Sequence, residues 1–366
     1  MQPVQAAILT EAGEALALES IIFHPLGPQD VRVKITATSL CQTDVAIRRG
    51  DHDYGAPIIM GHEASGIVQE VGVAVNRFAV GDTVISSSAP SCGSCLQCTA
   101  GRPHICALSS SVRTVPRASR ADGSVATGLF GLGTFAQEMV VNQASLVSVD
   151  TNLPPESLSL IGCGVTTGLS AALNRAAIPV GGSVVVIGCG TVGLSAIIGA
   201  HIAGATTIIA VDPLPERRLD AQQRGATHVI DSKDPDLVGA INSLTAGHGV
   251  DVTIDAVSRP ETVAQAQAVT RRAGEIIMIG MPPKEATFEL AALPFFLSEH
   301  RLSSALFGSA NIRRDFPAFV RLAEQGQLDL TGFVSRTLPL EQVNEGLDML
   351  ERGEVLRAVL LPGAQQ

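Results

Sequence analysis

Cysteine is the residue type with the clearest chemistry in this 366-residue sequence, and four of the seven cysteines are clustered. They are separated by two, two and seven residues, in a segment rich in Gly, Ser and Pro whose backbone can wrap around an ion. Four thiolates with no open position predict a tetrahedral structural zinc. The cluster, which we call the cysteine lobe, spans residues 92–106 and contains Cys92, Cys95, Cys98 and Cys106.

Two other interpretations of the cysteine lobe are an iron–sulfur cluster and a set of free thiols. A bacterial iron–sulfur motif usually has Pro after its last Cys, where this chain has Ala107. The N-terminus lacks a basic segment followed by a long apolar run. We therefore expect a cytoplasmic protein whose cysteines serve metal binding or catalysis rather than disulfides.

Three residues far apart in the sequence predict a second metal site. Cys41 lies in CQTD, His62 in GHE and Cys163 in GCG. Two thiolates and one imidazole leave a fourth position open for water or substrate, as in catalytic zinc sites. A lone His is more often a buried core residue. Asp44 and Glu63 nevertheless favour a metal, because a metal-bound His generally donates its other N–H to a carboxylate.

A glycine motif predicts a dinucleotide site. Gly188, Gly190 and Gly193 form GCGTVG after a predicted strand and at the start of a predicted helix, where the glycines permit a tight turn and close approach to a pyrophosphate. Asp212 lies 19 residues past Gly193, where it would accept from a ribose 2′-OH and repel a 2′-phosphate. NAD is therefore favoured over NADP. Arg217 lies either near the adenosine ribose or on a solvated helix face.

The elements expected around these residues change character near residue 181. Before it the chain is β-rich, whereas after it strands and helices alternate, which predicts an α/β fold with a doubly wound parallel (Rossmann) sheet. The expected strands are 4–9, 31–38, 66–72, 135–141, 183–188, 207–212, 228–230, 250–257, 275–280 and 356–361, and the helices are 191–205, 214–224, 235–246, 260–272, 315–326 and 340–353.

Charge and hydropathy exclude several classes of partner. The chain has 35 acidic and 25 basic residues, a net charge of −10, and no basic cluster. This argues against nucleic acid and anionic membranes, which need a concentrated basic surface. No uninterrupted apolar run reaches the roughly 18 residues of a membrane helix.

Taken together, these motifs resemble the zinc-containing medium-chain alcohol dehydrogenase family, in particular its bacterial aryl- and primary-alcohol members. The matching segments are 61–72, 80–82, 92–106, 162–168, 188–193 and 356–360, in the family's order. The resemblance implies a GroES-like catalytic domain over 1–164, an NAD-binding domain over 165–305 and a return to the catalytic domain over 306–366. It also implies two zinc ions per chain and a homodimer or homotetramer, with 275–307 as a contact region.

The resemblance also assigns individual roles. Thr43 would accept the substrate proton, Asp44 would orient His62, and Glu63 would approach the zinc during ligand exchange. Thr167 and Val192 would line the nicotinamide, and Arg357 would contact the pyrophosphate. The implied substrate pocket consists of Ser88, Phe135, Met281 and Leu306, with His52 and Tyr54 near its mouth.

Two positions depart from the family pattern. Gln42 replaces a basic residue that touches the pyrophosphate, which predicts weaker NAD(H) binding. Ala46 replaces a relay histidine, and His52 is the nearest substitute in sequence, although a pocket-wall or surface role is the alternative.

The function implied is NAD-linked oxidation of primary aryl or medium-chain aliphatic alcohols to aldehydes, and the reverse. A thiol-dependent formaldehyde dehydrogenase is the alternative, and it would use basic residues at the pocket mouth such as Arg48, Arg49 and Arg113. A non-catalytic NAD(P)-binding protein is a third possibility from another class. The retained ligands and Thr43 argue against it, because an open metal site has no structural purpose.

Overall fold

The computed structural model describes residues 2–363, and the chain divides into two compact units. The first unit is Met1–Cys163 with Asn311–Gln366, and the second is Gly164–Ala310. The predicted ranges put these boundaries after residues 164 and 305. In the described part of the chain no helix is long and apolar enough to cross a membrane.

The first unit contains a closed barrel and a seven-stranded sheet. Barrel order is β1 (Val4–Leu9), β2 (Ala17–Phe23), β7 (Ala118–Arg120), β8 (Val125–Gly128) and β4 (Ile58–Ile59). Sheet order is β10 (Leu146–Ser148), β6 (Thr83–Ser86), β5 (Ala64–Val71), β3 (Asp30–Ser39), β18 (Ala358–Leu360) and β17 (Arg336–Leu338), with β9 (Glu138–Asn142) paired to β3. Alternate residues of β3, namely Val31, Val33 and Ile35, are buried in one hydrophobic cluster, as a strand with one core face requires.

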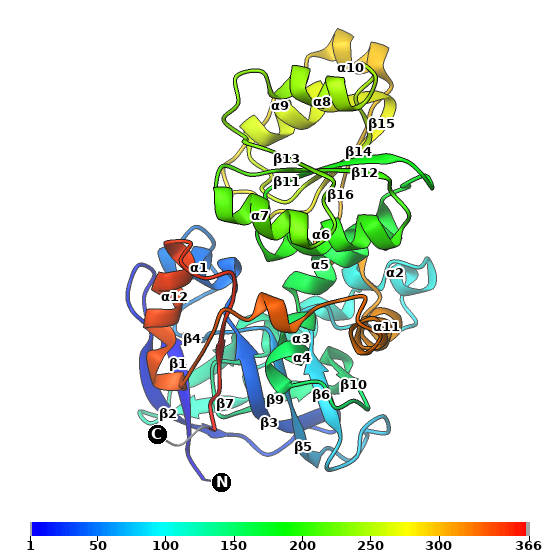
Figure 1. Cartoon of the computed structure of the whole chain (residues 1–366). Coiled ribbons are helices and arrows are strands. Elements are labelled where there is room, and N and C mark those ends of the chain that lie inside the picture. The colour runs from blue at the N-terminus through cyan, green and yellow to red at the C-terminus, as the bar shows by residue number, and fades with distance from the viewer. Residues whose placement is uncertain (1, 364–366) are drawn as a thin grey trace. The chain divides into compact units, whose positions relative to one another are not determined.

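The helices of the first unit lie between these strands in the sequence. They are α1 (Gln42–Arg49), α2 (Leu96–Thr99), α3 (Leu108–Arg113), α4 (Pro155–Ile161), α11 (Ile312–Glu324) and α12 (Val343–Glu351). Helices α1 and α12 lie side by side (Figure 1). Arg48 of α1 pairs with Asp348 at 2.7 Å and with Glu351 at 2.9 Å. The helix that begins directly after Cys41 is therefore tied to the C-terminal part of the chain.

The second unit is built on a six-stranded sheet in which every pairing is parallel. The order is β13 (His228–Ile230), β12 (Thr207–Val211), β11 (Ser183–Ile187), β14 (Val250–Asp255), β15 (Thr270–Met278) and β16 (Arg301–Ser304). Helices α6 (Thr191–Ile202) and α7 (Pro215–Gln223) cover one face, and α8 (Leu237–Leu244) and α9 (Pro260–Val269) cover the other (Figure 1). The predicted doubly wound parallel sheet is therefore confirmed.

Three predicted elements differ from the structure. Strand β9 begins at Glu138 rather than at residue 135, and β15 begins at Thr270, inside the helix predicted to end at 272. The segment 275–307, the expected contact region, contains the helix α10 (Ala292–Ser298), which is not among the predicted helices. Leu293 and Phe296 of α10 are 66% and 76% exposed. Short apolar runs do not distinguish a strand from a helix, which explains the error.

The turn between β11 and α6 depends on close contact between strand and helix. Gly188 has a φ of +88°, a left-handed conformation that favours glycine. A Cβ on Gly193 would lie 1.7 Å from the carbonyl oxygen of Gly188, whereas a Cβ on Gly190 would meet no atom within 4 Å. The close packing therefore requires a glycine at position 193, whereas position 190 has room for a larger residue.

We predict that Gly193→Ala destabilises the protein by about 1–3 kcal/mol, the usual cost of overpacking. The measurement is the free energy of unfolding in urea. Gly190→Ala is the matched control, because its φ of −73° suits alanine, and it should change stability by less than about 0.5 kcal/mol. Equal destabilisation by the two variants would contradict this account of the turn.

Candidate metal centres and dinucleotide site

The structure brings the three distant residues of the predicted second metal site together in the first unit. Cys41 follows β3, His62 and Glu63 precede β5, and Cys163 follows α4. One ligand atom from each of these four residues lies within 4.8 Å of the others. Since Cys, His and Glu supply the N, S and O atoms that zinc prefers, the cluster could hold a zinc ion.

Asp44 links two of these residues through its single carboxylate. One oxygen, Oδ2, accepts from the backbone N–H of Cys41 at 3.0 Å, and the other, Oδ1, lies 3.1 Å from Nδ1 of His62. Asp44 is completely buried, so water does not compete for either interaction. When Nδ1–H donates to this carboxylate, the lone pair of Nε2 is left for a metal.

The ring of His62 provides a test of whether a metal fits here. Its Nε2 atom is buried and has no hydrogen-bond partner among the described residues. A buried polar atom without a partner costs free energy, and such atoms are rare in folded proteins. A zinc ion would satisfy Nε2, and the thiols of Cys41 and Cys163 are within reach of the same ion.

Glu63 is held by a cation and a hydroxyl. Arg357, whose side chain is 3% exposed, places Nη2 3.2 Å from Oε1 of Glu63, and Ser39 donates its hydroxyl to Oε2 at 2.6 Å. Arg357 also donates to the carbonyl of Leu40, next to Cys41. These contacts of Arg357 are with Glu63 of the metal cluster and with the residue before Cys41, and its predicted pyrophosphate contact stays a prediction.

Electrostatics at this cluster follow from burial and close contact. A hydrogen bond from Cys163 is the main cause that holds the pKa of Cys41 well below its usual value, and Arg357 also lowers it although burial opposes the shift. Burial opposes a charged His62, but Asp44 and Cys41 outweigh it and raise the pKa of His62. Burial raises the pKa of Glu63 to about 8, although Arg357 opposes the rise. A thiolate at Cys41 is the form that binds metal.

The four sulfurs of the cysteine lobe have the spacing of a tetrahedral zinc site. The distances between Sγ atoms are 3.5 Å for Cys92–Cys106, 3.8 Å for Cys95–Cys106 and 4.0 Å for Cys92–Cys98. A regular tetrahedron with zinc–sulfur bonds of about 2.3 Å has edges of about 3.8 Å. These three distances bracket that value, and all four sulfurs lie within 4.8 Å of one another, so the spacing of the lobe fits a zinc ion.

Backbone N–H groups surround the sulfurs of the cysteine lobe. Ser94 and Cys95 donate to Sγ of Cys92 at 3.5 and 3.3 Å, and Leu108 donates to Sγ of Cys106 at 3.3 Å. The donors from Ser94 and Cys95, led by the backbone N–H of Ser94, lower the pKa of Cys92 to about 6. Arg313 of α11 donates to the carbonyl of Ser91 at 2.6 Å and attaches the lobe to the first unit.

The second unit carries the glycine turn and the acidic residue predicted to bind a dinucleotide. Asp212 follows β12 and accepts from the backbone N–H of Cys189 at 2.7 Å and of Leu214 at 2.9 Å. Each carboxylate oxygen keeps a further lone pair for a hydroxyl donor. The open space beside Gly190, at the N-terminus of α6, fits a phosphate group, which helix N-termini favour.

Two family models match this chain. The model of the alcohol dehydrogenase GroES-like domain matches residues 27–151, and the model of the zinc-binding dehydrogenase matches residues 191–325. An NDMA-dependent alcohol dehydrogenase of Amycolatopsis methanolica is 33% identical over 98% of this chain and 99% of its own length. This chain belongs to the zinc-containing medium-chain alcohol dehydrogenase family.

Two further relatives are similar over nearly the whole chain. An S-(hydroxymethyl)glutathione dehydrogenase of Synechocystis is 33% identical over 97% of this chain and 99% of its own length. The crystal structure of benzyl alcohol dehydrogenase from Acinetobacter calcoaceticus superposes with a TM-score of 0.92 at 29% identity, covering 99% of both chains. This member of the alcohol dehydrogenase family is thus an oxidoreductase with a small-molecule substrate, and zinc-dependent alcohol oxidation is the chemistry of its family.

The remaining predicted residues are spread over both units of this alcohol dehydrogenase. Thr43 is half-buried in the first turn of α1, and Thr167 and Val192 lie on α5 (Gly164–Ser170) and α6, which pack together. Of the predicted pocket residues, Ser88 is buried and His52 half-buried in the first unit, while Met281 and Leu306 are exposed in the second. Arg217 is half-buried on α7.

The place of Phe135 in the substrate pocket stays a prediction. Phe135 is completely buried in a hydrophobic cluster with Met60 and Leu129. Phe130, five residues earlier, instead packs its ring edge to face with His62, with a centroid distance of 5.4 Å. The sequence signal for Phe130 is its position in GLFGLG, where glycines allow a tight turn.

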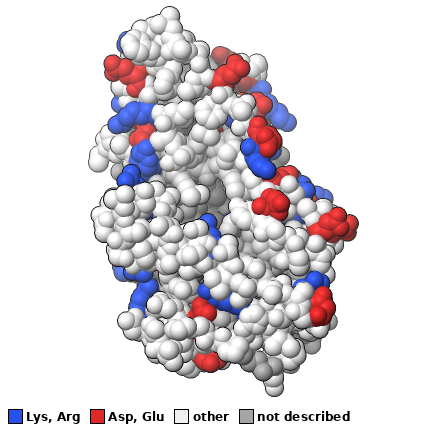
Figure 2. Space-filling view, turned by 180° about the vertical axis from the view of Figure 1, so that it is seen from behind, with Lys and Arg blue, Asp and Glu red and all other residues white. Residues whose placement is uncertain are grey.

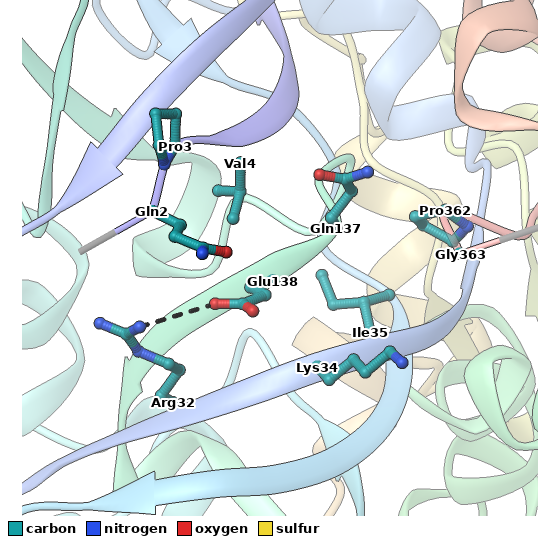
Figure 3. A pocket seen from close by; sticks show the side chains of 10 residues that line it. All are labelled: Gln2, Pro3, Val4, Arg32, Lys34, Ile35, Gln137, Glu138, Pro362 and Gly363. Atoms are coloured by element: carbon teal, nitrogen blue, oxygen red, sulfur yellow. Dashed lines mark ion pairs between the residues drawn. The ribbon is translucent and has the colours of Figure 1, made fainter.

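Neither a pocket in the first unit nor the surface charge suggests another ligand class. A pocket of about 490 Å³ between the N-terminal strand, β3 and β9 contains none of the predicted site residues (Figure 3). Its Arg32 is paired with Glu138 at 3.8 Å. Acidic and basic side chains are mixed over the face seen in Figure 2, without a continuous basic area.

We predict that Asp44→Asn lowers the zinc affinity of the Cys41–His62–Cys163 site about 10- to 100-fold, the usual effect of removing a carboxylate behind a ligating histidine. The measurement is competition with a chromophoric zinc chelator. Asp53→Asn is the control, because Asp53 is exposed and makes a local bond to the N–H of Gly55. Unchanged affinity in Asp44→Asn would mean that packing alone orients His62.

Proposed function

We propose that this alcohol dehydrogenase oxidises primary alcohols to aldehydes with NAD, and catalyses the reverse reaction, with aryl alcohols as the preferred class. The observation that carries the proposal is the cluster of Cys41, His62 and Cys163, in which the buried Nε2 of His62 has no hydrogen-bond partner among the described residues and lies 3.8 Å from Oε1 of Glu63. Three ligands leave a fourth position for the substrate oxygen. We further propose two zinc ions per chain and a homodimer or homotetramer.

Each residue around the proposed zinc ion has its own role in alcohol oxidation. A zinc ion held by these three ligands would supply a Lewis acid that lowers the pKa of the substrate hydroxyl. The hydroxyl of Thr43 accepts the substrate proton. With Ala46 in place of a relay histidine, that proton leaves to water or through His52. Asp44 keeps His62 in one tautomer while the charge at the site changes.

Features of both units support NAD as the acceptor. NAD would supply a hydride acceptor, and the glycine turn from Gly188 to Gly193 would hold its pyrophosphate. Asp212 would accept from the ribose hydroxyls and would repel the additional phosphate of NADP. Thr167 and Val192 would line the nicotinamide, and Arg357 would contact the pyrophosphate.

Aromatic side chains near His62 support an aryl alcohol as substrate. Phe130 packs against His62, and Tyr54 packs edge to face on Phe130 with a centroid distance of 5.0 Å. Aromatic rings prefer such contacts with one another. The similarity to the benzyl alcohol dehydrogenase of Acinetobacter calcoaceticus points to the same class.

The thiol-dependent formaldehyde dehydrogenase is the second candidate, because the Synechocystis relative carries that kind of name. Such a substrate needs free cations at the pocket mouth. Arg48 is paired with Asp348 and Glu351, and Arg49 is paired with Asp51 and Glu351. Arg48 and Arg49 therefore have acidic partners already, so of the three predicted arginines only Arg113, which has no acidic partner among the described residues, could serve the second candidate.

The proposed function predicts about two zinc ions per chain and activity on benzyl and cinnamyl alcohols with NAD. Cys163→Ser should abolish activity and retain the zinc of the cysteine lobe. The measurements are metal analysis and initial rates with aryl, aliphatic and thiol-adduct substrates. The rates are compared with NAD, with NADP and with NDMA, on which the Amycolatopsis enzyme depends. A single zinc ion, or activity only on the thiol adduct, would overturn the proposal.

We also predict that Gln42→Arg slows NADH release about tenfold or more, because a charged donor to the pyrophosphate adds a strong hydrogen bond. In the structure the amide of Gln42 donates to the carbonyl of Leu350 at 3.0 Å, so it is engaged at the end of α12. Stopped-flow measurement of NADH dissociation tests this. A rate no slower than that of the parent enzyme would refute it.

A further inference from the structure

Arg113 is a half-buried cation with no acidic partner among the described residues. It is the last residue of α3, and its Nη2 donates to the carbonyl of Ser88. Its guanidinium carbon lies 5.4 Å from the centroid of the Phe130 ring. Its Nε is buried without a hydrogen-bond partner. The groups that compensate its desolvation are therefore a carbonyl and an aromatic face.

The ring that Arg113 covers is the one that packs against the metal cluster. Phe130 makes edge-to-face contacts with His62 at 5.4 Å and with Tyr54 at 5.0 Å. Its backbone φ is +54°, in the left-handed region that is unusual for a side chain other than glycine. Such a conformation persists only where the surroundings hold it, and Arg113 is part of those surroundings.

The backbone on either side of this contact is also closely packed. A Cβ on Gly131 would lie 2.7 Å from the carbonyl oxygen of Val112 and 2.8 Å from Cα of Arg113. Helix α3 begins two residues after Cys106, and the N–H of Leu108 donates to the sulfur of that cysteine. A continuous set of contacts therefore leads from the cysteine lobe through Arg113 to Phe130 and His62.

We propose that Arg113 is a positioning residue that fixes Phe130 against His62 and the backbone at Ser88, and so selects aryl over small aliphatic alcohols. A benzyl group needs a fixed ring beside the metal, whereas a two-carbon alcohol does not. The planar guanidinium suits this role because it can cover a ring and donate to a carbonyl at once. The selectivity part of the proposal rests on the proposed alcohol oxidation.

The test compares zinc-loaded Arg113→Met, Arg113→Lys, Phe130→Leu and the double variant Arg113→Met/Phe130→Leu. We expect Arg113→Met to lower kcat/KM for benzyl alcohol about tenfold, mainly through KM, and to change it less than about twofold for ethanol. Arg113→Lys keeps a cation near the ring and should recover part of the loss. The double variant should be no worse than Phe130→Leu, because both changes remove one interaction. Arg102→Met is the control, since Arg102 is an exposed arginine of the neighbouring cysteine lobe.

A second readout does not require activity. Tyr54 is the single tyrosine of a chain without tryptophan, so intrinsic fluorescence and near-ultraviolet circular dichroism report on the contact with Phe130. We expect Arg113→Met to reduce the tyrosine dichroism and to increase fluorescence quenching by acrylamide, while Arg102→Met leaves both unchanged.

Three results would overturn the proposal: an unchanged tyrosine signal in Arg113→Met, equal losses for benzyl alcohol and ethanol, or strictly additive effects in the double variant. A much larger loss for 4-carboxybenzyl alcohol than for benzyl alcohol would also overturn it, because Arg113 would then bind the substrate directly. If the parent enzyme oxidises no alcohol, the proposed function fails, and the tyrosine signal still decides whether Arg113 positions Phe130.

Discussion

A single buried carboxylate, that of Asp44, connects the backbone and the side chains on which the metal cluster depends. It accepts from the N–H of Cys41 and lies against the ring of His62, so two residues from different strand ends share one anchor. In water this carboxylate would be solvated, and inside the protein the N–H donor and the imidazole replace that solvation. The same contact orients the start of α1, and it thereby fixes the position of Thr43 one residue earlier.

The positive charges of two arginines near this cluster, one buried and one half-buried, are balanced by different groups. Arg357 faces a carboxylate, Glu63, and its charge is neutralised at 3.2 Å. Arg113 faces a carbonyl and the quadrupole of an aromatic ring, which attract it more weakly. Burial raises the pKa of Glu63 to about 8, and Arg357 opposes that rise, so the first pairing favours the charged form of the carboxylate beside the ligands. The second leaves a net positive charge beside the aromatic wall.

The sequence was sufficient to predict those parts of the molecule in which chemistry is encoded by local spacing or by strong periodicity. The cysteine lobe, the glycine turn and the parallel sheet are of this kind, because each is defined within a few tens of residues. The ligands Cys41, His62 and Cys163 come from three distant segments. They could be assigned to one metal site only because Asp44 lies near Cys41 and Glu63 follows His62 in the sequence. Phe130 could not be chosen over Phe135 in this way, since both lie among apolar and glycine residues and only tertiary packing buries one of them. The contact of Arg357 with Glu63 is likewise invisible without the fold, because the two residues are distant in sequence and meet only when β18 pairs beside β3.

That last strand has a consequence for how the protein is made. Val359 and Leu360 of β18 pair with Ser39 and Thr38 of β3, and the carbonyl of Ala358 accepts from Leu40, next to the ligand Cys41. Domains generally fold in order as they leave the ribosome, N-terminal part first. Here the sheet of the first unit lacks a strand until β18 has been synthesised, whereas every strand of the second unit's sheet is encoded between Gly164 and Ala310. The second unit can therefore fold before β18 is synthesised, and the Cys41–His62–Cys163 site takes its final form only after β18 has paired with β3.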